Sequence, residues 1–123
     1  MYKKLFSAKK IGSMEVPNRI VMTAMGNHIA NEDGTVSEAD IAFYGARAKG
    51  GVGLVITECA CVDFATGKGN LRQISVDDDK YIPGMAKLAD AIHQHGAKCL
   101  LQISHTGRGS RRAVTGHQPV APS

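Results

Sequence analysis

The sequence predicts an α/β fold, because segments rich in β-forming residues alternate with segments of helical periodicity. The β-forming segments are residues 19–25, 52–57 and 98–104. Each pair is separated by a stretch long enough for a helical crossover, which neighbouring parallel strands require. We therefore expect the order βαβαβ, with parallel strands and right-handed crossovers.

Length and composition are those of one small globular domain. The chain has 123 residues, of which 43% are hydrophobic and 21% charged. Much of the formal net charge of +4 at pH 7 lies near the two ends, and we interpret it as solvated surface. The first residues lack the apolar core of a signal peptide, and no apolar run of about 18 residues occurs. We expect a cytoplasmic protein that does not enter membranes.

The first elements are a hairpin and a strand. Residues 11–16 predict a short hairpin with a turn near Gly12, and Pro17 with Asn18 marks the entry to the strand at residues 19–25. This strand ends in small residues and a methionine. We expect its carboxyl end to open onto a site.

The first helix has a defined start and stop in the sequence. Residues 31–34 predict a turn, and Ser37 with Asp40 three positions later is typical of a capping box. Gly50 and Gly51 end the helix. Its apolar face comprises Ile41, Tyr44 and Ala48.

The second crossover contains a long irregular connection. Residues 52–57 form an aliphatic run, typical of a strand buried on both faces of a parallel sheet. Residues 59–76 follow without clear periodicity, and connections of this length are usually functional or disordered. The second helix begins near Asp78 or Asp79, with Pro83 in its first turn.

The remaining elements are the end of that helix, a strand and a loop. The apolar positions of the helix are Met85, Leu88, Ala89 and Ile92. Gly96 is the expected stop, residues 98–104 form the third strand, and residues 106–123 form a loop rich in Gly, Arg and Pro.

Two architectures fit this alternation, the doubly wound sheet and the (β/α)8 barrel. A dinucleotide-binding doubly wound sheet needs G-x-G-x-x-G between the first strand and helix, where this chain has the single Gly26. The nearest match begins at Gly107, after the third strand, and has Arg112 in place of the last glycine. We therefore predict the amino-terminal βαβαβ portion of a (β/α)8 TIM barrel, preceded by a short hairpin.

The cysteines and histidines show no metal-site spacing. Cys59 and Cys61 are spaced C-x-C and Cys99 lies in another strand, which fits neither a zinc ribbon nor a C-x-x-C redox pair. We interpret the cysteines as small buried apolar residues. The five histidines form no H-E-x-x-H motif, so we predict no metal site.

In a barrel the chemistry lies at the carboxyl ends of the strands. Those ends are residues 23–25, 58–60 and 102–105, so three strands direct small and polar residues toward one face. Small residues let a flat ring lie against the backbone. The carboxamide of Gln102 offers a donor and an acceptor together, the complement of the edge of a flavin pyrimidine. From spacing alone, a structural role for Gln102 fits equally well.

Several motifs resemble one known family, in the same order and over essentially the whole chain. They include Asn18-Arg-Ile-Val-Met22 and Leu101-Gln-Ile-Ser-His-Thr-Gly-Arg108. The other matching segments are residues 4–6, 23–25, 47–58, 95–98 and 119–123. These resemble the amino-terminal motifs of the old yellow enzyme family of FMN-dependent ene-reductases. Residues 22–25 and 48–51 are most similar to the bacterial NADH:flavin oxidoreductase branch, which includes 2,4-dienoyl-CoA reductase and 2-enoate reductase.

The resemblance implies FMN at the barrel mouth, reduced by NADH or NADPH. Hydride would pass from flavin N5 to an activated C=C bond of an enone, enoate or enoyl-CoA-type substrate. The implied flavin contacts are Thr23, Ala24, Met25, Cys59 and Gln102, and the implied substrate-facing residue is His28. No catalytic residue is assigned, because the family's carbonyl-binding pair and proton-donating tyrosine come from later strands.

Three positions depart from the family pattern. Gly26 stands where one branch has a flavin-tuning cysteine, Ala24 replaces a frequent proline, and Cys59 replaces a common alanine. The flavin tuning of that branch is therefore not expected.

The length limits what the chain does alone. A TIM barrel needs eight strands and about 250 residues. We expect residues 1–123 to be a partial FMN-binding barrel domain, an amino-terminal fragment that is inactive alone and self-associates to cover its strand edges.

Two other functions remain as alternatives. In the first, Arg108, Arg111 and Arg112 grip a nucleic acid or another polyanion, although no aromatic residue for base stacking lies near them. The second is a phosphate-binding aldolase, but the only candidate Schiff-base residue, Lys98, begins its strand at the wrong end. We expect a small-molecule substrate and no nucleic acid.

Overall fold

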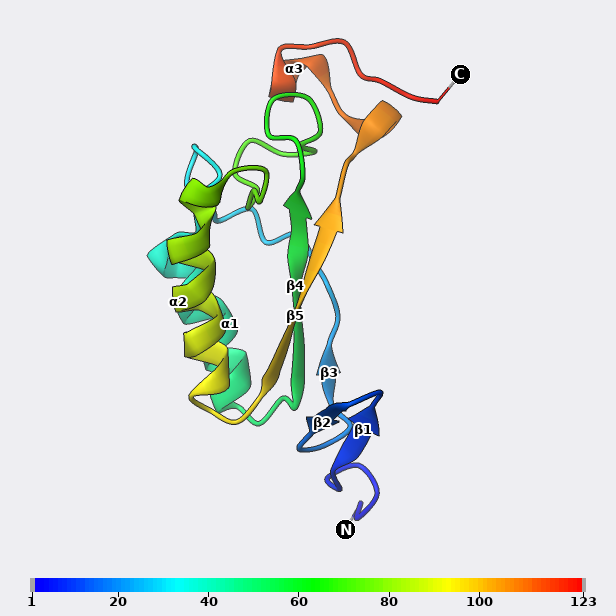
Figure 1. Cartoon of the computed structure of the whole chain (residues 1–123), viewed down its shortest axis with the longest axis vertical. Coiled ribbons are helices and arrows are strands. Elements are labelled where there is room, and N and C mark those ends of the chain that lie inside the picture. Colours follow the sequence, from blue (N-terminus) through cyan, green and yellow to red (C-terminus); the bar gives the residue numbers. More distant parts are fainter. Residues whose placement is uncertain (1, 123) are drawn as a thin grey trace.

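In the computed structural model, which describes residues 2–122, two helices cover one face of a three-stranded parallel sheet (Figure 1). Helices α1 (Glu38–Lys49) and α2 (Ile82–His93) lie side by side on that face. The opposite face of the sheet carries no helix among the described residues. Met1 and Ser123, the outermost residues of the domain predicted over residues 1–123, lie outside the described part.

The sheet has the predicted parallel topology. Its strands are β3 (Val21–Met22), β4 (Leu54–Cys61) and β5 (Lys98–Ser104), in the order β3-β4-β5. The βαβαβ order and the bounds predicted for the third strand are confirmed.

The amino-terminal hairpin is also confirmed. Strands β1 (Lys9–Ile11) and β2 (Met14–Val16) pair antiparallel around a turn in which Gly12 has φ +60°. This backbone conformation favours glycine. The hairpin lies near the amino ends of the sheet strands (Figure 1).

The first sheet strand is shorter than predicted. The sequence predicts residues 19–25, but only Val21 and Met22 pair with β4. Beyond them the backbone turns away: the Asn27 N–H donates to the Glu58 side chain rather than to the backbone of β4, and His28 has φ +57°. Local β-propensity is therefore overridden by tertiary contacts.

The second sheet strand is longer than predicted. It was expected to end at Thr57, with Glu58 and Cys59 beyond it, but both residues belong to β4, which continues to Cys61. The sequence predicts a strand end at the polar residues that lie at its centre. In the folded chain they have partners inside the protein, so the strand continues through them.

Helix α1 begins at the predicted capping box. The Asp40 N–H donates to Ser37 Oγ (3.1 Å), and the Ser37 N–H donates to Asp40 Oδ2 (3.0 Å). The helix ends at Gly50, as predicted, and buries Tyr44 and Ala48 against the sheet. The capping box thus sets the start of the first crossover.

Helix α2 is preceded by one 3-10 turn, η1 (Asp79–Tyr81). The Asp78 carboxyl caps this turn by accepting from the Lys80 N–H (2.9 Å). The helical segment thus begins at the predicted position as a 3-10 turn, whereas α2 itself begins three residues later, and Gly96 with φ +79° follows the helix end. Leu88 and Ile92 are buried at the predicted positions.

The region after β5 is not an open loop throughout. It contains a 3-10 turn, η2 (Gly107–Gly109), and a short helix, α3 (Arg112–Thr115), beyond the carboxyl end of β5 (Figure 1). The connection predicted over residues 59–76 is likewise partly ordered, since Cys61 pairs with Ser75 in an isolated parallel bridge.

Candidate functional site

The candidate site lies at the carboxyl end of the sheet, on the face that the helices leave uncovered. Cys59 of β4 is the register partner of Gln102 of β5. The Cys59 side chain is half-buried and Gln102 is exposed. Among residues 2–122, the Gln102 carboxamide forms no side-chain hydrogen bond, so its donor and its acceptor are both available to a ligand.

A register shift in β4 produces this pairing. Ile56 pairs with Leu100 and Cys59 pairs with Gln102, so two residues of β4 face one residue of β5. The two residues of this bulge, Thr57 and Glu58, are both buried. Thr57 lines a cavity of about 480 Å³ beside α2, and the Glu58 N–H donates to the Tyr44 hydroxyl of α1 (2.8 Å). Cys59 thereby returns to the uncovered face.

The segment after β3 contributes the other candidate contacts. Thr23 and Met25 are exposed and Ala24 is half-buried, with 59% of the Met25 surface accessible. The segment ends at Asn27, whose N–H donates to Glu58 Oε2 (3.0 Å) and whose side-chain amide donates to Asp40 Oδ1 (3.1 Å). These bonds tie the segment to β4 and to α1.

Strand order places the predicted contacts on both sides of β4. The segment 23–25 follows β3 on one side, and Gln102 lies in β5 on the other, with Cys59 between them. Two strand spacings amount to about 10 Å. The small Ala24 and Cys59 leave room for a flat ring system, and the Gln102 carboxamide supplies edge donors and acceptors, so these residues fit a flavin.

His28 is exposed and has the only positive φ of a non-glycine residue among residues 2–122. Its ring lies against Gly26, where an added Cβ would be 3.2 Å from His28 Cε1. Gly26 therefore accommodates the imidazole at the rim of the candidate site.

Two polar residues next to the candidate contacts are buried, which the sequence did not predict. Glu58 is only 1% exposed, and its two carboxyl oxygens accept from the Asn27 and Ile74 N–H groups. Gln73 is 3% exposed, donates to the Cys59 carbonyl (2.6 Å) and accepts from the Gly69 N–H (2.8 Å). The prediction that Glu58 points toward the site face is wrong. A lone acid inside an apolar strand was the signal that it has buried partners.

Burial is the main cause of the raised pKa values of one tyrosine and two cysteines near the site. It raises the pKa of Tyr44 to about 12, and the charges of Glu58 and Asp40 act in the same direction. Burial also raises the pKa of the Cys61 and Cys99 thiols. Cys61 is fully buried, as predicted, whereas Cys59 and Cys99 are half-buried. The two raised thiols are therefore poor nucleophiles.

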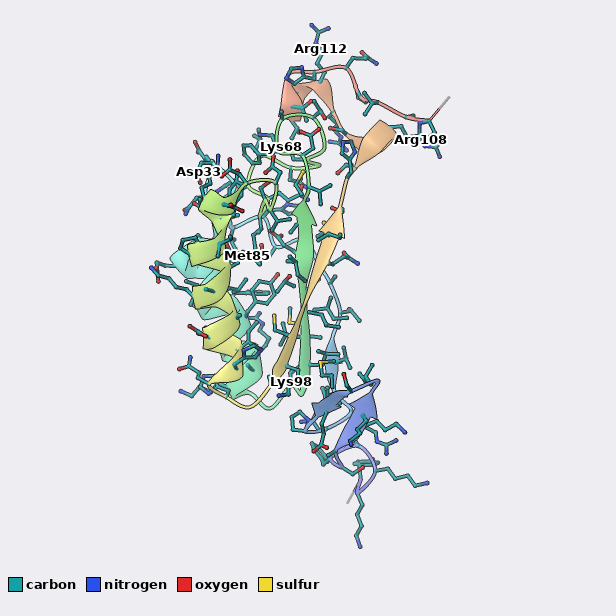
Figure 2. The ribbon with its side chains drawn as sticks, in the orientation of Figure 1. Asp33, Lys68, Met85, Lys98, Arg108 and Arg112 are labelled. Carbon is teal, nitrogen blue, oxygen red and sulfur yellow. The ribbon has the colours of Figure 1, made fainter. Side chains whose placement is uncertain are left out.

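The charged residues considered for the two alternative functions lie at or beyond the two ends of the sheet. Figure 2 shows Arg108 and Arg112 beyond the carboxyl ends of the strands and Lys98 at the opposite end of the sheet. Lys98 is thus remote from the candidate site, as expected. Among residues 2–122, no group of His, Cys, Asp or Glu could hold a metal ion.

Across the part of the chain that the structure describes, every helix is too short or too polar to cross a bilayer.

Comparison with known proteins identifies the family. The profile of the NADH:flavin oxidoreductase / NADH oxidase family matches residues 4–123. A NADH oxidase of Thermoanaerobacter brockii is 50% identical over 123 residues, which are 99% of this chain and 19% of that protein. The solved complex of 2-naphthoyl-CoA reductase with 2-naphthoyl-CoA superposes with a TM-score of 0.89 at 35% identity, covering 95% of this chain and 18% of that chain.

An old yellow enzyme homologue from Zymomonas mobilis has the same fold, with a TM-score of 0.89 at 29% identity, over 98% of this chain and 33% of that chain. The chain thus spans between about a fifth and a third of the length of these proteins, and it corresponds to their amino-terminal part. The barrel portion predicted from the sequence is confirmed. Enzymes of this type use FMN, with NADH or NADPH as reductant. The chain belongs to the NADH:flavin oxidoreductase / NADH oxidase family.

Proposed function

We propose that this chain forms one wall of the FMN site in an NAD(P)H-dependent oxidoreductase that reduces C=C bonds activated by a carbonyl group. The observation that carries the proposal is the Cys59–Gln102 pair, which presents a free carboxamide beside a small side chain at the carboxyl end of the sheet. Strand ends of this kind form the active sites of barrel enzymes.

The contacts follow from the chemistry of each residue. The Gln102 carboxamide would pair with the pyrimidine edge of the flavin, and Cys59 would lie against the ring. The segment of Thr23, Ala24 and Met25 would supply backbone and side-chain contacts from the other side of β4. FMN, when bound, supplies hydride transfer, while the protein residues bind and orient the ring.

The proposed substrates are enones, enoates or enoyl-CoA-type thioesters. The similarity to a reductase that was solved with a CoA thioester supports this class. We propose that His28 faces the substrate, because it is exposed and lies at the rim next to the segment 23–25.

A chimera tests the proposal. The matching 123 residues of the T. brockii NADH oxidase would be replaced by this chain, and the purified chimera assayed for FMN content and for cyclohexenone reduction with NADH and with NADPH. We expect bound FMN and turnover. A folded chimera that retains no flavin would refute the proposed function.

The isolated chain is proposed to be inactive. Its uncovered sheet face leaves a flavin with protein on one side only. After gel filtration with FMN, we expect the chain to elute without flavin, whereas stoichiometric retention would contradict this part of the proposal.

We also propose that the isolated chain self-associates through β5 and α2. β5 has one strand neighbour among residues 2–122, Ile103 of this strand is 66% exposed, and Leu101, which lines the apolar cavity beside α2, is 37% exposed. An unpaired edge with exposed apolar residues favours association. Sedimentation velocity should show oligomers that Ile103→Glu reduces and the exposed control Val120→Glu does not. A monomeric wild-type chain would contradict the idea.

A cytoplasmic location is part of the same proposal. Cys59, Cys61 and Cys99 are all free thiols, which persist in a reducing compartment. Fluorescence microscopy of cells that express this chain fused to a fluorescent protein would check the location.

A further inference from the structure

Glu58 is a buried carboxyl group inside an otherwise apolar strand. Its backbone N–H is held by the Tyr44 hydroxyl (2.8 Å), so the strand is anchored to α1 at this point. Its side chain reaches two separate segments: Oε2 accepts from the Asn27 N–H (3.0 Å) and Oε1 accepts from the Ile74 N–H (3.1 Å). One carboxyl group therefore joins the segment after β3 to the segment that returns along β4.

The first joined segment carries candidate contacts, and the second is bonded to one. Asn27 lies two positions after Met25, at the end of the segment 23–25. Ile74 follows Gln73, whose amide donates to the Cys59 carbonyl (2.6 Å). The positions of both contacts thus depend on bonds that converge at residues 58 and 59 of β4.

We propose that Glu58 is the positioning residue of the candidate site. Its carboxyl group holds these two segments in one arrangement along the edge of β4 that faces away from β5, and this aligns residues 23–25 with Cys59. The inference rests on the proposed function only for the identity of the ligand. The alignment itself is a property of the described residues.

The chemistry of the side chain explains why a carboxyl group stands here. An ionised carboxyl group has acceptors on both oxygens, whereas a carboxamide has one acceptor oxygen and one donor nitrogen. Glu58→Gln keeps the size and shape but turns an NH2 group toward either the Asn27 or the Ile74 N–H. Leaving a buried donor without an acceptor costs more than losing the bond alone.

A purely structural role predicts a different pattern from a positioning role. Loss of general stability would lower protection throughout the core, including Leu88 and Ile92 of α2. Loss of positioning would move the amide resonances of Thr23, Ala24 and Met25 while the core stays protected. Amide resonances and hydrogen exchange of the full 123-residue chain separate the two patterns.

The experiment compares wild type with Glu58→Gln and with Glu15→Gln, an exposed glutamate of the hairpin. In Glu58→Gln we expect the Asn27 or Ile74 amide to exchange at least about tenfold faster and the resonances of residues 23–25 to shift. The control should change neither. Unmoved resonances at residues 23–25 would overturn the proposal.

Two further measurements decide the role of Glu58 if Glu58→Gln does not fold. In wild type, through-hydrogen-bond couplings from the Asn27 and Ile74 nitrogens to the Glu58 carboxyl carbon should be visible, and their absence would overturn the proposal without any substitution. If Glu58→Gln does not fold, Glu58→Asp replaces it, since its shorter arm should produce the same shifts. FMN binding by the chimera is measured separately: a chimera without flavin refutes the proposed function, and the amide result still decides the role of Glu58.

Discussion

Cys59 of β4 lies opposite Gln102 of β5 because the register of the two strands shifts after Ile56. Without the shift, regular alternation would turn Cys59 toward the helices and Glu58 toward the uncovered face. The bulge exchanges these positions. It buries the acid among backbone donors and presents the small thiol beside the free carboxamide of Gln102.

Replacement of Gln102 should weaken flavin binding without unfolding the protein. In the chimera, we expect Gln102→Leu to lower FMN affinity by about tenfold or more, because the carboxamide is the edge-recognising group. The side chain is exposed, so the free energy of unfolding should change by no more than about 0.5 kcal/mol. Flavin fluorescence titration measures the affinity. The matched variant Gln118→Leu, also at an exposed position, should bind FMN normally, and an unchanged affinity in Gln102→Leu would exclude its proposed role.

Tyr44 should contribute measurably to stability through its hydroxyl. Tyr44→Phe keeps the ring but leaves the buried Glu58 N–H without its acceptor. We expect the free energy of unfolding to fall by about 1–3 kcal/mol, measured by urea denaturation. Tyr2→Phe is the control, since Tyr2 is 80% exposed. Equal stability of the two variants would show that the Tyr44 bond is dispensable.

The same hydroxyl predicts a dependence on alkaline pH. Because the pKa of Tyr44 is raised from 10.0 to about 12 in the folded chain, the neutral phenol favours folding. This contribution is complete below pH 10 and is lost as the pH rises toward 12. The stability difference between wild type and Tyr44→Phe should therefore narrow over that interval, as urea denaturation at each pH would show. A constant difference would mean that Tyr44 titrates normally.

The capping box of α1 should contribute measurably to the free energy of unfolding. Ser37 accepts from the Asp40 N–H (3.1 Å) and also donates to the Ile29 carbonyl (2.7 Å), so it caps the helix and holds the preceding segment. We expect Ser37→Ala to lower the free energy of unfolding by about 1–2 kcal/mol, and Ser13→Ala in the exposed hairpin turn to have little effect. Thermal unfolding of both variants measures the difference. A loss no larger than that of the control would show that the cap is not formed in solution.

The pKa of Asp63 should lie below its ordinary value, chiefly because of Thr66. The side-chain hydroxyl and then the N–H of Thr66 lower the pKa of this carboxyl group from 3.8. Its contribution to stability is therefore present above pH 3.8 and is lost as the pH falls through the lower folded value. We expect Thr66→Val to raise the pKa of Asp63, as followed by carboxyl resonances during an acid titration.

Thr35→Val is the matched control for that titration. It removes the corresponding hydroxyl beside Asp33, whose pKa is lowered in the same way. This substitution should raise the pKa of Asp33 and leave the pKa of Asp63 unchanged. A shift of both carboxyl groups in either variant would indicate a general change of the loops instead.

The local signals in the sequence were sufficient for the order of the main helices and strands. Ser37 with Asp40 marked the helix start, Gly12 marked the hairpin turn, and the aliphatic run before Ser104 marked the last strand. Each of these depends on residues only a few positions apart, so the bonds that form them are present in the local sequence. The βαβαβ order and the chain's place in a flavin-dependent family follow from such segments.

The arrangement of the site depended on contacts between distant positions. The early departure of β3, the extension of β4 and the inward turn of Glu58 all involve partners 14 to 31 residues away. A buried carboxyl group and an exposed one look alike in sequence, because only the packed chain shows which backbone N–H groups lack another acceptor. The sequence by itself therefore determined the order of the main elements, and its resemblance to the family predicted the candidate contacts Thr23, Ala24, Met25, Cys59 and Gln102. Only the tertiary structure decided that Cys59 and Gln102 stand opposite each other and that Glu58 lies behind them, since both depend on strand register.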